Sequence, residues 1–294
     1  MEERAVFKNK LLPYLLIAPQ IILTGLWFIY PAVVASYQSL FRSDPLGIRT
    51  TFVGVQNYTR LFSDPRFFSS LRVTLVFAVS VTVLSMFIGL FLASMADKPL
   101  RGRKVYRTLL LLPYALAPAV TAVLWRFLLA PRIGIIARFL GDIGIRWDYR
   151  LDGVQALFLV ILVAVWQRIA YNFIFYLAAL QSMPRSVIEA ARLDGAGSKR
   201  TFWSVVFPIL SPTTFFLLIM NIVYSLFEGF GIIHALTQGG PAGATEILVY
   251  RLYVDGMIYQ NINRSAAQSV VLLVFVVLLT ALQFRWVDRR VHYG

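Results

Sequence analysis

The chain has 294 residues, of which 59% are hydrophobic, 15% aromatic and only 14% charged, and its formal net charge is +14. A water-soluble domain of this size carries about a quarter charged residues, so the composition excludes an ordinary soluble fold. Several apolar stretches reach the roughly 20 residues that cross about 30 Å of hydrocarbon. The sequence predicts an all-α polytopic membrane protein, with residues 1–294 forming a single transmembrane domain. Because there are no cysteines, disulfides, thiol catalysis and Cys-ligated metals are excluded.

Six membrane-spanning helices are predicted. In chain order they cover residues 11–39, 73–96, 108–129, 154–180, 209–233 and 266–284. The first apolar run is too long for a cleavable signal peptide and lacks a small-residue cleavage site.

The distribution of lysine and arginine predicts the orientation. They are concentrated in the N-terminal tail, the second link, the fourth link and the C-terminal tail, whereas aspartates and a glutamate dilute them in the other loops. Positively charged links are retained in the cytoplasm and attract anionic lipid headgroups. We therefore expect both termini to be cytoplasmic and membrane lipids to be partners. A basic chain can also indicate nucleic-acid binding, but this placement between apolar stretches favours a topological role and no nucleic-acid partner.

Prolines interrupt two of the predicted spans. Pro13, Pro19 and Pro31 lie in the first span, and Pro113 and Pro118 lie in the third. A proline frees a backbone carbonyl and bends a helix. Two interpretations are open: the bends are packing kinks in a helix bundle, or they open a path between its halves.

The fourth link, residues 181–208, differs from every other link. Ser186 and Glu189 have the spacing of a capping box, which predicts a short helix from Ser186 to Leu193. Gly195 can adopt the left-handed conformation that ends a helix. The link therefore predicts a rigid cytoplasmic helix joined to two spans, so that a displacement of the helix moves the spans.

A second short helix is predicted in the same link. Ser198 has the residue type of an N-cap, and the helix is expected to run from there towards Pro208. An ordinary structured loop is the alternative interpretation of this segment.

These residues resemble a known motif. Glu189-Ala190-Ala191, then Asp194-Gly195-Ala196, then Pro208, is similar to the EAA loop of permease subunits in ATP-binding-cassette importers. The resemblance implies the type I importer permease fold with this loop as the coupling helix that docks on an ATPase. The residues that it implies for docking are Ser186, Glu189, Ala190, Ala191, Asp194, Gly195, Ala196 and Gly197.

The ATPase is expected to be a separate chain. Residues 195–199 are superficially similar to a phosphate-binding loop, but the spacing G-x-x-x-x-G-K-[ST] is absent. The chain is therefore expected to be non-catalytic and to bind no cofactor, with ATP and Mg²⁺ used by the partner. His234 and His292 are the only histidines, and no spacing typical of metal ligands accompanies them.

The resemblance extends over the whole chain. TQGGP at 237–241 is similar to the LTxGGP turn of the maltose-permease-like branch. LPYLLIAPQ at 12–20, FVGVQNY at 52–58, LLPYALAPAV at 111–120 and SAAQSVVL at 265–272 are similar to A-type permeases of the Ugp importer family. That family imports glycerol-3-phosphate and glycerophosphodiesters across the bacterial inner membrane.

The family likeness also implies partners: a second, different permease in a heterodimer, a homodimeric ATPase, and a periplasmic or lipid-anchored solute-binding protein. A disaccharide or oligosaccharide is the alternative substrate.

Polar residues within the spans are candidates for the translocation path, because a central charge costs about 2.5–3.5 kcal/mol on insertion. Each of two spans carries such residues on one face: Arg168, Tyr171 and Asn172 in the fourth, and Asn221, Tyr224 and Glu228 in the fifth. With a rise of about 1.5 Å per residue, Arg168 and Glu228 differ in depth by roughly 10 Å, which disfavours a direct ion pair. Arg168 is then a cation on the path, although a structural role for these residues remains the alternative.

Two other classes of membrane protein fit less well. A secondary transporter usually shows an internal repeat, and none is clear here. An intramembrane enzyme needs a convergent acid, base or metal set, which the spans lack.

Overall fold

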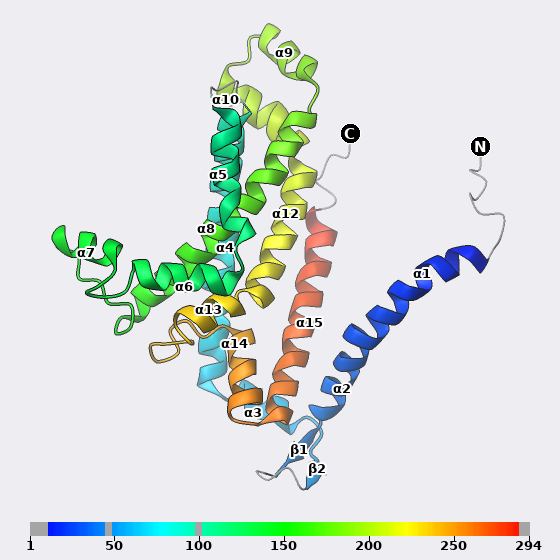
Figure 1. The fold of residues 1–294 in the computed structure, drawn as a ribbon. Helices are drawn as coiled ribbons and strands as arrows, with labels where there is room; N and C mark the ends of the chain where they lie inside the picture. Colours follow the sequence, from blue (N-terminus) through cyan, green and yellow to red (C-terminus); the bar gives the residue numbers. More distant parts are fainter. Residues whose placement is uncertain (1–10, 45–48, 98–101, 288–294) are drawn as a thin grey trace. The chain divides into compact units, whose positions relative to one another are not determined.

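The computed structural model describes residues 11–44, 49–97 and 102–287 (Figure 1). The chain divides into two compact units. The first contains the chain up to Asp64 together with Leu252–Val274, and the second contains Pro65–Arg251 together with the chain from Phe275 onward.

Within the described residues, five helical segments are long and apolar enough to cross a membrane: Leu11–Gln38, Pro65–Ala96, Gly153–Ser182, Ser211–Glu228 and Ile262–Arg285. They coincide with five of the six predicted spans. The helix of the predicted second span begins eight residues earlier than predicted, and the helix of the predicted fifth span ends at Glu228, five residues before the predicted end.

The first unit begins with a helical segment built from α1 (Leu11–Thr24), a π-helical turn (Gly25–Ile29) and α2 (Tyr30–Gln38). Two short antiparallel strands follow, β1 (Phe41–Ser43) and β2 (Thr50–Phe52), paired with Phe41 opposite Phe52. Helix α3 covers Gln56–Phe62, and the unit also holds a π-helical turn at Val254–Ile258 and the start of α15 (Ile262–Val287).

Two buried asparagines fix this unit. Asn57 Nδ2 donates to the carbonyls of Ser39 and Phe41, both at 2.7 Å. Asn263 accepts from Ser43 N at 2.8 Å and donates to the Gln38 carbonyl at 3.0 Å. Both side chains therefore join backbone groups that have no partner within a helix or strand, as buried polar groups require.

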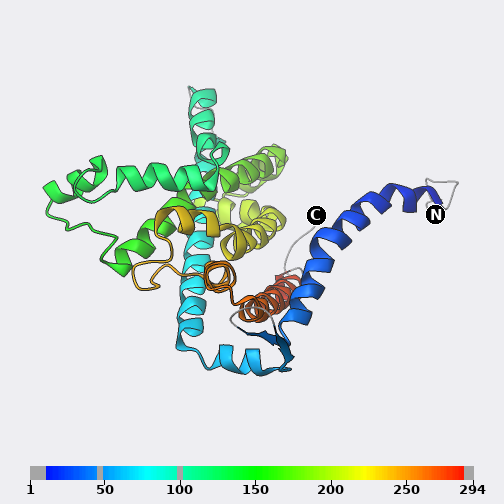
Figure 2. The ribbon, with the colours of Figure 1, turned by 60° about the horizontal axis from the view of Figure 1, so that its bottom comes forward.

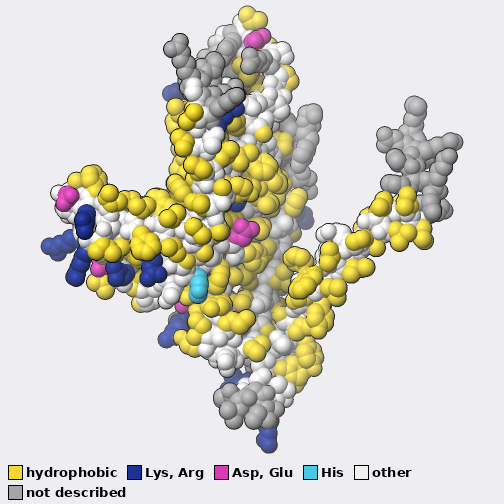
Figure 3. All heavy atoms as spheres, in the orientation of Figure 1, with side chains coloured by type: hydrophobic (Ala, Val, Ile, Leu, Met, Phe, Trp, Pro, Cys, Tyr) yellow, Lys and Arg dark blue, Asp and Glu magenta, His cyan; other side chains and the backbone are white. Residues whose placement is uncertain are grey.

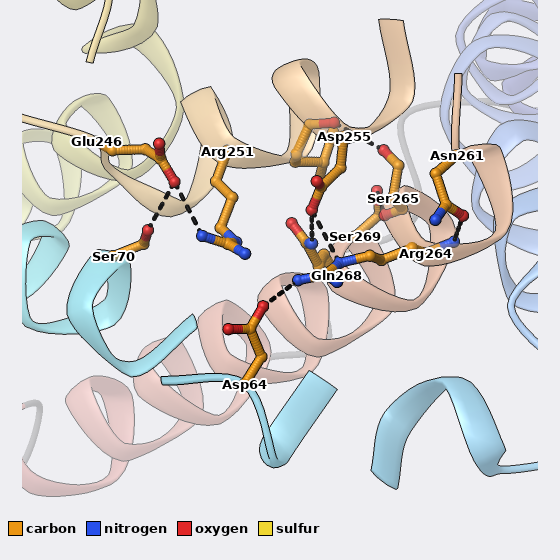
Figure 4. A network of polar contacts seen from close by, with 11 residues as sticks. Asp64, Ser70, Glu246, Arg251, Asp255, Asn261, Arg264, Ser265, Gln268 and Ser269 are labelled. Atoms are coloured by element: carbon orange, nitrogen blue, oxygen red, sulfur yellow. Dashed lines mark hydrogen bonds and ion pairs between the residues drawn. The ribbon is translucent and has the colours of Figure 1, made fainter. Parts of the chain in front are cut away.

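A charged network lies at the start of α15 (Figure 4). Arg264 Nε lies 3.1 Å from Asp255 Oδ2, and the same guanidinium pairs with Asp64. Gln268 also donates to Asp255, which is 7% exposed. The network neutralises a carboxylate that would otherwise be costly to bury.

The second unit contains α4 (Pro65–Ala96), α5 (Arg103–Ala115), α6 (Pro118–Leu128), α7 (Ile135–Asp142), α8 (Gly153–Ser182) and α9 (Arg185–Leu193). They are followed by α10 (Ser198–Thr201), a π-helical turn (Phe202–Val206), α11 (Phe207–Ile209), α12 (Ser211–Val223), a second π-helical turn (Tyr224–Glu228) and α13 (Phe230–Leu236). Helix α14 covers Leu248–Tyr253. Figure 2 shows these elements from a second direction.

Helices α4 and α8 pack closely along their lengths. Gly89 on α4 makes the approach possible, because a Cβ there would lie 2.6 Å from Asn172 Cβ on α8. Both helices carry fully buried side chains: Phe77, Val81, Leu159, Val163, Phe173 and Tyr176. Asp152 caps the start of α8 by accepting from Val154 N and Gln155 N.

The predicted third span, 108–129, is not one kinked helix. Helices α5 and α6 meet at an angle of 103°, and the two residues between them, Leu116 and Ala117, are extended with ψ of 135° and 143°. Pro118 disfavours the helical conformation for the residue that precedes it. A sixth crossing is present only if this bent pair counts as one span.

Candidate functional site

A buried polar cluster joins α4, α8 and α12. Asn172 donates to Ser85 Oγ at 3.0 Å, and Asn221 donates to Asn172 Oδ1 at 2.7 Å. These three side chains are fully buried. The predicted polar faces of the fourth and fifth spans therefore do meet, but both asparagines bond between helices and do not line an open passage.

Arg168 lies beside this cluster on α8. Its Nε donates to Asn221 Oδ1 at 3.0 Å, and its guanidinium carbon lies 4.0 Å from the ring centre of Tyr171 and 4.5 Å from that of Tyr224. The residue is 7% exposed. Within the described part of the chain, its buried Nη2 has no hydrogen-bond partner. The arginine is thus held through Nε and by two aromatic faces, while its buried Nη2 makes no hydrogen bond with the described residues.

A cavity of about 460 Å³ lies at this position. Its wall is made by Tyr114–Pro118 at the break between α5 and α6, by Gln167 and Arg168 from α8, and by Tyr224 and Glu228 from the π-helical turn. Glu228 is exposed. Among the described residues, no ion pair joins Arg168 to Glu228, as the depth argument predicts.

The six predicted path residues therefore separate into three groups. Arg168, Tyr224 and Glu228 line the cavity. Tyr171 packs against the Arg168 guanidinium. Asn172 and Asn221 are structural cross-links.

Sequence reasoning missed Gln167. Its Nε2 donates to the Leu116 carbonyl at 2.8 Å, and its Oε1 accepts from Tyr224 OH at 3.2 Å. A polar residue in the middle of an apolar span was the signal that was available. It precedes Tyr171 by four residues and so lies on the same helix face.

The fourth link forms the predicted short helix, α9, at one end of the second unit (Figure 1). Gly195 follows it with φ of +80°, and Ala196 N donates to the Ala191 carbonyl at 3.0 Å. This is the Schellman ending that the glycine predicts. Glu189 and Ala190 are exposed, and Leu193 is 89% exposed.

Both predicted N-caps in this link are wrong. Helix α9 begins at Arg185, so Ser186 lies within its first turn. Helix α10 has Gly197 as its N-cap, without a side-chain cap, and Ser198 is its first residue. Helix α10 is also only four residues long and continues as a π-helical turn before α11. Gly197 is extended, with φ of −68° and ψ of 162°, and α10 begins after it without a side-chain cap.

Basic side chains gather on one side of the segment that contains α6 and α7. Figure 3 shows Lys and Arg side chains along the lower side of this segment, while the upper side in the same view is largely hydrophobic. Among the described residues, no three His, Cys, Asp or Glu side chains are grouped so that they could hold a metal ion.

Comparisons with known proteins identify the family. The model of the family "Binding-protein-dependent transport system inner membrane component" matches residues 85–293. The chain is 52% identical to the sn-glycerol-3-phosphate transport system permease protein UgpA of Agrobacterium fabrum over 292 residues, which cover 99% of this chain and 100% of that protein. It is 47% identical to the protein of the same name from Pectobacterium atrosepticum, over 99% of this chain and 98% of that one.

Two solved structures share the fold. A chain of a bacterial alginate ABC transporter, in complex with an alginate pentasaccharide-bound periplasmic protein, has a TM-score of 0.82 at 21% identity over 96% of both chains. A second structure, of a bacterial ABC transporter involved in alginate import, has a TM-score of 0.78 at 22% identity over 94% of this chain and 96% of that chain. This chain belongs to the family of binding-protein-dependent transport system inner membrane components.

Proposed function

We propose that this chain is a permease subunit of an ATP-driven importer of glycerol-3-phosphate or glycerophosphodiesters. The relatives that match almost its entire length carry the name of an sn-glycerol-3-phosphate transport permease. The observation in the structure that carries the substrate class is Arg168, a buried cation with an unpartnered terminal nitrogen on the wall of a cavity.

The chemistry of Arg168 suits a phosphate ester. A guanidinium binds a phosphate through paired N–H donors, and the Nε edge of Arg168 is already used by Asn221. A ligand therefore meets the Nη edge, where an oxyanion would supply the partner that Nη2 lacks. Glu228 repels a phosphate, but its carboxylate can accept hydrogen bonds from glycerol hydroxyls. The two side chains would then orient a phosphorylated polyol across the cavity.

The motor is assigned to a partner. A homodimeric ATPase would use ATP and Mg²⁺, while α9 docks on it through Ser186, Glu189, Ala190, Ala191, Asp194, Gly195, Ala196 and Gly197. Exposure of Glu189, Ala190 and Leu193 supports docking. Because α9 continues from α8 across a single residue pair, Met183 and Pro184, its displacement would act directly on the helix that carries Arg168.

The remaining partners follow from the family. A second, different permease would supply the other half of the path, and a periplasmic or lipid-anchored binding protein would deliver the solute. If the bent pair crosses the membrane once, six spans would put the fourth link and both termini on the same side. A cytoplasmic ATPase docked on that link would then mean that both termini are cytoplasmic.

The test is uptake by the complete complex in proteoliposomes loaded with ATP. We expect uptake of glycerol-3-phosphate, a loss of at least about tenfold in Arg168→Ala and a smaller loss in Arg168→Lys, which keeps the charge but not the paired donors. Arg126→Ala is the matched control, because that arginine is exposed and is not among the residues that line the cavity. Glycerol-3-phosphate uptake that is unchanged in Arg168→Ala contradicts the path assignment, and uptake of maltose alone contradicts the substrate.

A further inference from the structure

The break between α5 and α6 leaves a backbone carbonyl that needs a partner. In a continuous helix the Leu116 carbonyl would accept from the amide four residues later. Here Leu116 and Ala117 are extended and α6 starts again at Pro118. Within a membrane an unsatisfied carbonyl costs several kcal/mol, so a break at this position persists only where another group satisfies it.

Gln167 is that group. Its Nε2 donates to the Leu116 carbonyl at 2.8 Å. Because a carbonyl only accepts, the nitrogen of the amide must face it, which leaves Oε1 for the Tyr224 hydroxyl at 3.2 Å. Gln167 is 6% exposed and Tyr224 is 3% exposed, so little water competes for either bond.

The three segments joined by this amide are the walls of the cavity. The break supplies Tyr114–Pro118, α8 supplies Gln167 and Arg168, and the π-helical turn supplies Tyr224 and Glu228. Helix breaks and π-helical turns are both departures from regular α-helix that recur at functional sites and hinges. One side chain therefore ties the two irregular segments to the helix that carries Arg168.

We propose that Gln167 is a positioning residue that latches the α5–α6 break to α8 and to the π-helical turn, and so sets whether the cavity is closed at this wall. The proposal rests on the transport function, since it assigns the movable wall of the proposed translocation cavity. It predicts two arrangements of the break, one latched by Gln167 as in this structure and one in which the Leu116 carbonyl is released to water that has entered the cavity.

Because the chain contains no cysteine, an introduced cysteine is its only thiol and can be labelled specifically. Ala117 is exposed and lies at the break, so Ala117→Cys in the complete complex places a thiol at the latched wall. The rate of its reaction with a membrane-impermeant maleimide is measured on this chain. We expect Gln167→Met, which keeps the length but lacks the amide, to raise that rate about tenfold, as the loss of a buried hydrogen bond implies. Tyr224→Phe removes only the hydrogen bond between the Tyr224 hydroxyl and Gln167 Oε1, and should raise the labelling rate by about threefold.

The matched control is Gln155→Met, because Gln155 lies on the same helix and also bonds backbone groups, Asp148 N and the Arg146 carbonyl. It should leave the labelling rate within a factor of about two. A second reporter, Ala93→Cys, is fully buried on α4 and detects general loosening. The ratio of substrate-stimulated to basal ATPase activity should also fall in Gln167→Met.

The outcomes separate the possibilities. Unchanged labelling of Ala117→Cys in Gln167→Met overturns the latch, as does an equal rise at Ala93→Cys. If the unaltered complex transports no glycerol-3-phosphate but the labelling difference persists, the substrate assignment fails and the latch stands.

Discussion

Asn172 and Asn221 exchange amide hydrogen bonds across the interface of α8 and α12. Asn221 Nδ2 donates to Asn172 Oδ1 at 2.7 Å, and Asn172 Nδ2 lies 3.3 Å from Asn221 Oδ1. The same Asn221 oxygen also accepts from Arg168 Nε. The pair therefore holds two spans together and fixes the direction in which the arginine points.

Asn221→Leu should destabilise the protein by about 1–2 kcal/mol, because it leaves the Asn172 oxygen and the Arg168 Nε without a partner in a buried site. The measurement is the unfolding midpoint of the purified complex in detergent. In a double-mutant cycle with Asn172→Leu, the double variant should lose less than the sum of the single losses. Strict additivity would mean that the two amides do not interact.

Gly195→Ala should weaken the coupling helix. Gly195 has φ of +80°, a conformation that costs an alanine about 1–2 kcal/mol, so the Schellman ending of α9 would be strained. We expect less ATPase to copurify with the permease pair. Gly144→Ala is the matched control, since Gly144 follows α7 with φ of +84°, has open space around it and lies outside the fourth link. Equal recovery of ATPase in both variants would contradict a docking role for the shape of α9.

Gly89→Ala should lower stability by about 1–3 kcal/mol, the usual cost of overpacking. Its Cβ would lie 2.6 Å from Asn172 Cβ and 3.2 Å from Phe173 N, and the backbone atom cannot move aside. Thermal unfolding of the complex measures the change. Gly141→Ala on α7 meets no atom within 4 Å and should be neutral or stabilising, because alanine favours a helix over glycine. A neutral Gly89→Ala would argue against the close approach of α4 and α8.

Arg264→Ala should destabilise the first unit by about 1–3 kcal/mol. This loss is smaller than the cost of breaking a fully buried ion pair, because the arginine side chain is 32% exposed. It removes the cation that neutralises the buried Asp255. Arg60→Ala serves as the control, because Arg60 is an exposed residue of α3, and should change stability by less than about 0.5 kcal/mol. Limited proteolysis of the first unit reports the difference, and identical cleavage rates in the two variants would contradict it.

The spans and the coupling helix could be predicted because each rests on a local signal. Long apolar runs identified the five continuous crossings, and Gly195 identified the end of α9 from its conformational freedom alone. The residues at which helices begin were harder to predict. Ser186 and Ser198 are residue types that commonly cap a helix, but each lies just inside its helix. The sequence does not rank these two serines against Pro184 and Gly197, the residues that directly precede the two helices.

The arrangement of the cavity could not be predicted, because it depends on contacts between distant segments. Pro113 and Pro118 indicated a bend, yet the Leu116 carbonyl at the 103° bend is satisfied by Gln167, a side chain 51 residues away in sequence. Likewise, the sequence shows that Asn172, Asn221 and Arg168 are polar residues within spans. That the two asparagines face one another depends on the packing of α8 against Ser85 and Gly89 of α4. Helical periodicity shows which residues share one face of a helix, but it does not show which other helix packs against that face.

The central claim is that this chain moves a phosphorylated solute only as part of an ATP-driven complex. The most direct test compares glycerol-3-phosphate uptake into liposomes that contain this chain alone with uptake into liposomes that contain the two permeases and the ATPase, each with the binding protein present. We predict no uptake by the chain alone under any ion gradient, and ATP-dependent uptake by the complete complex. Accumulation driven by an ion gradient through this chain alone would contradict the account.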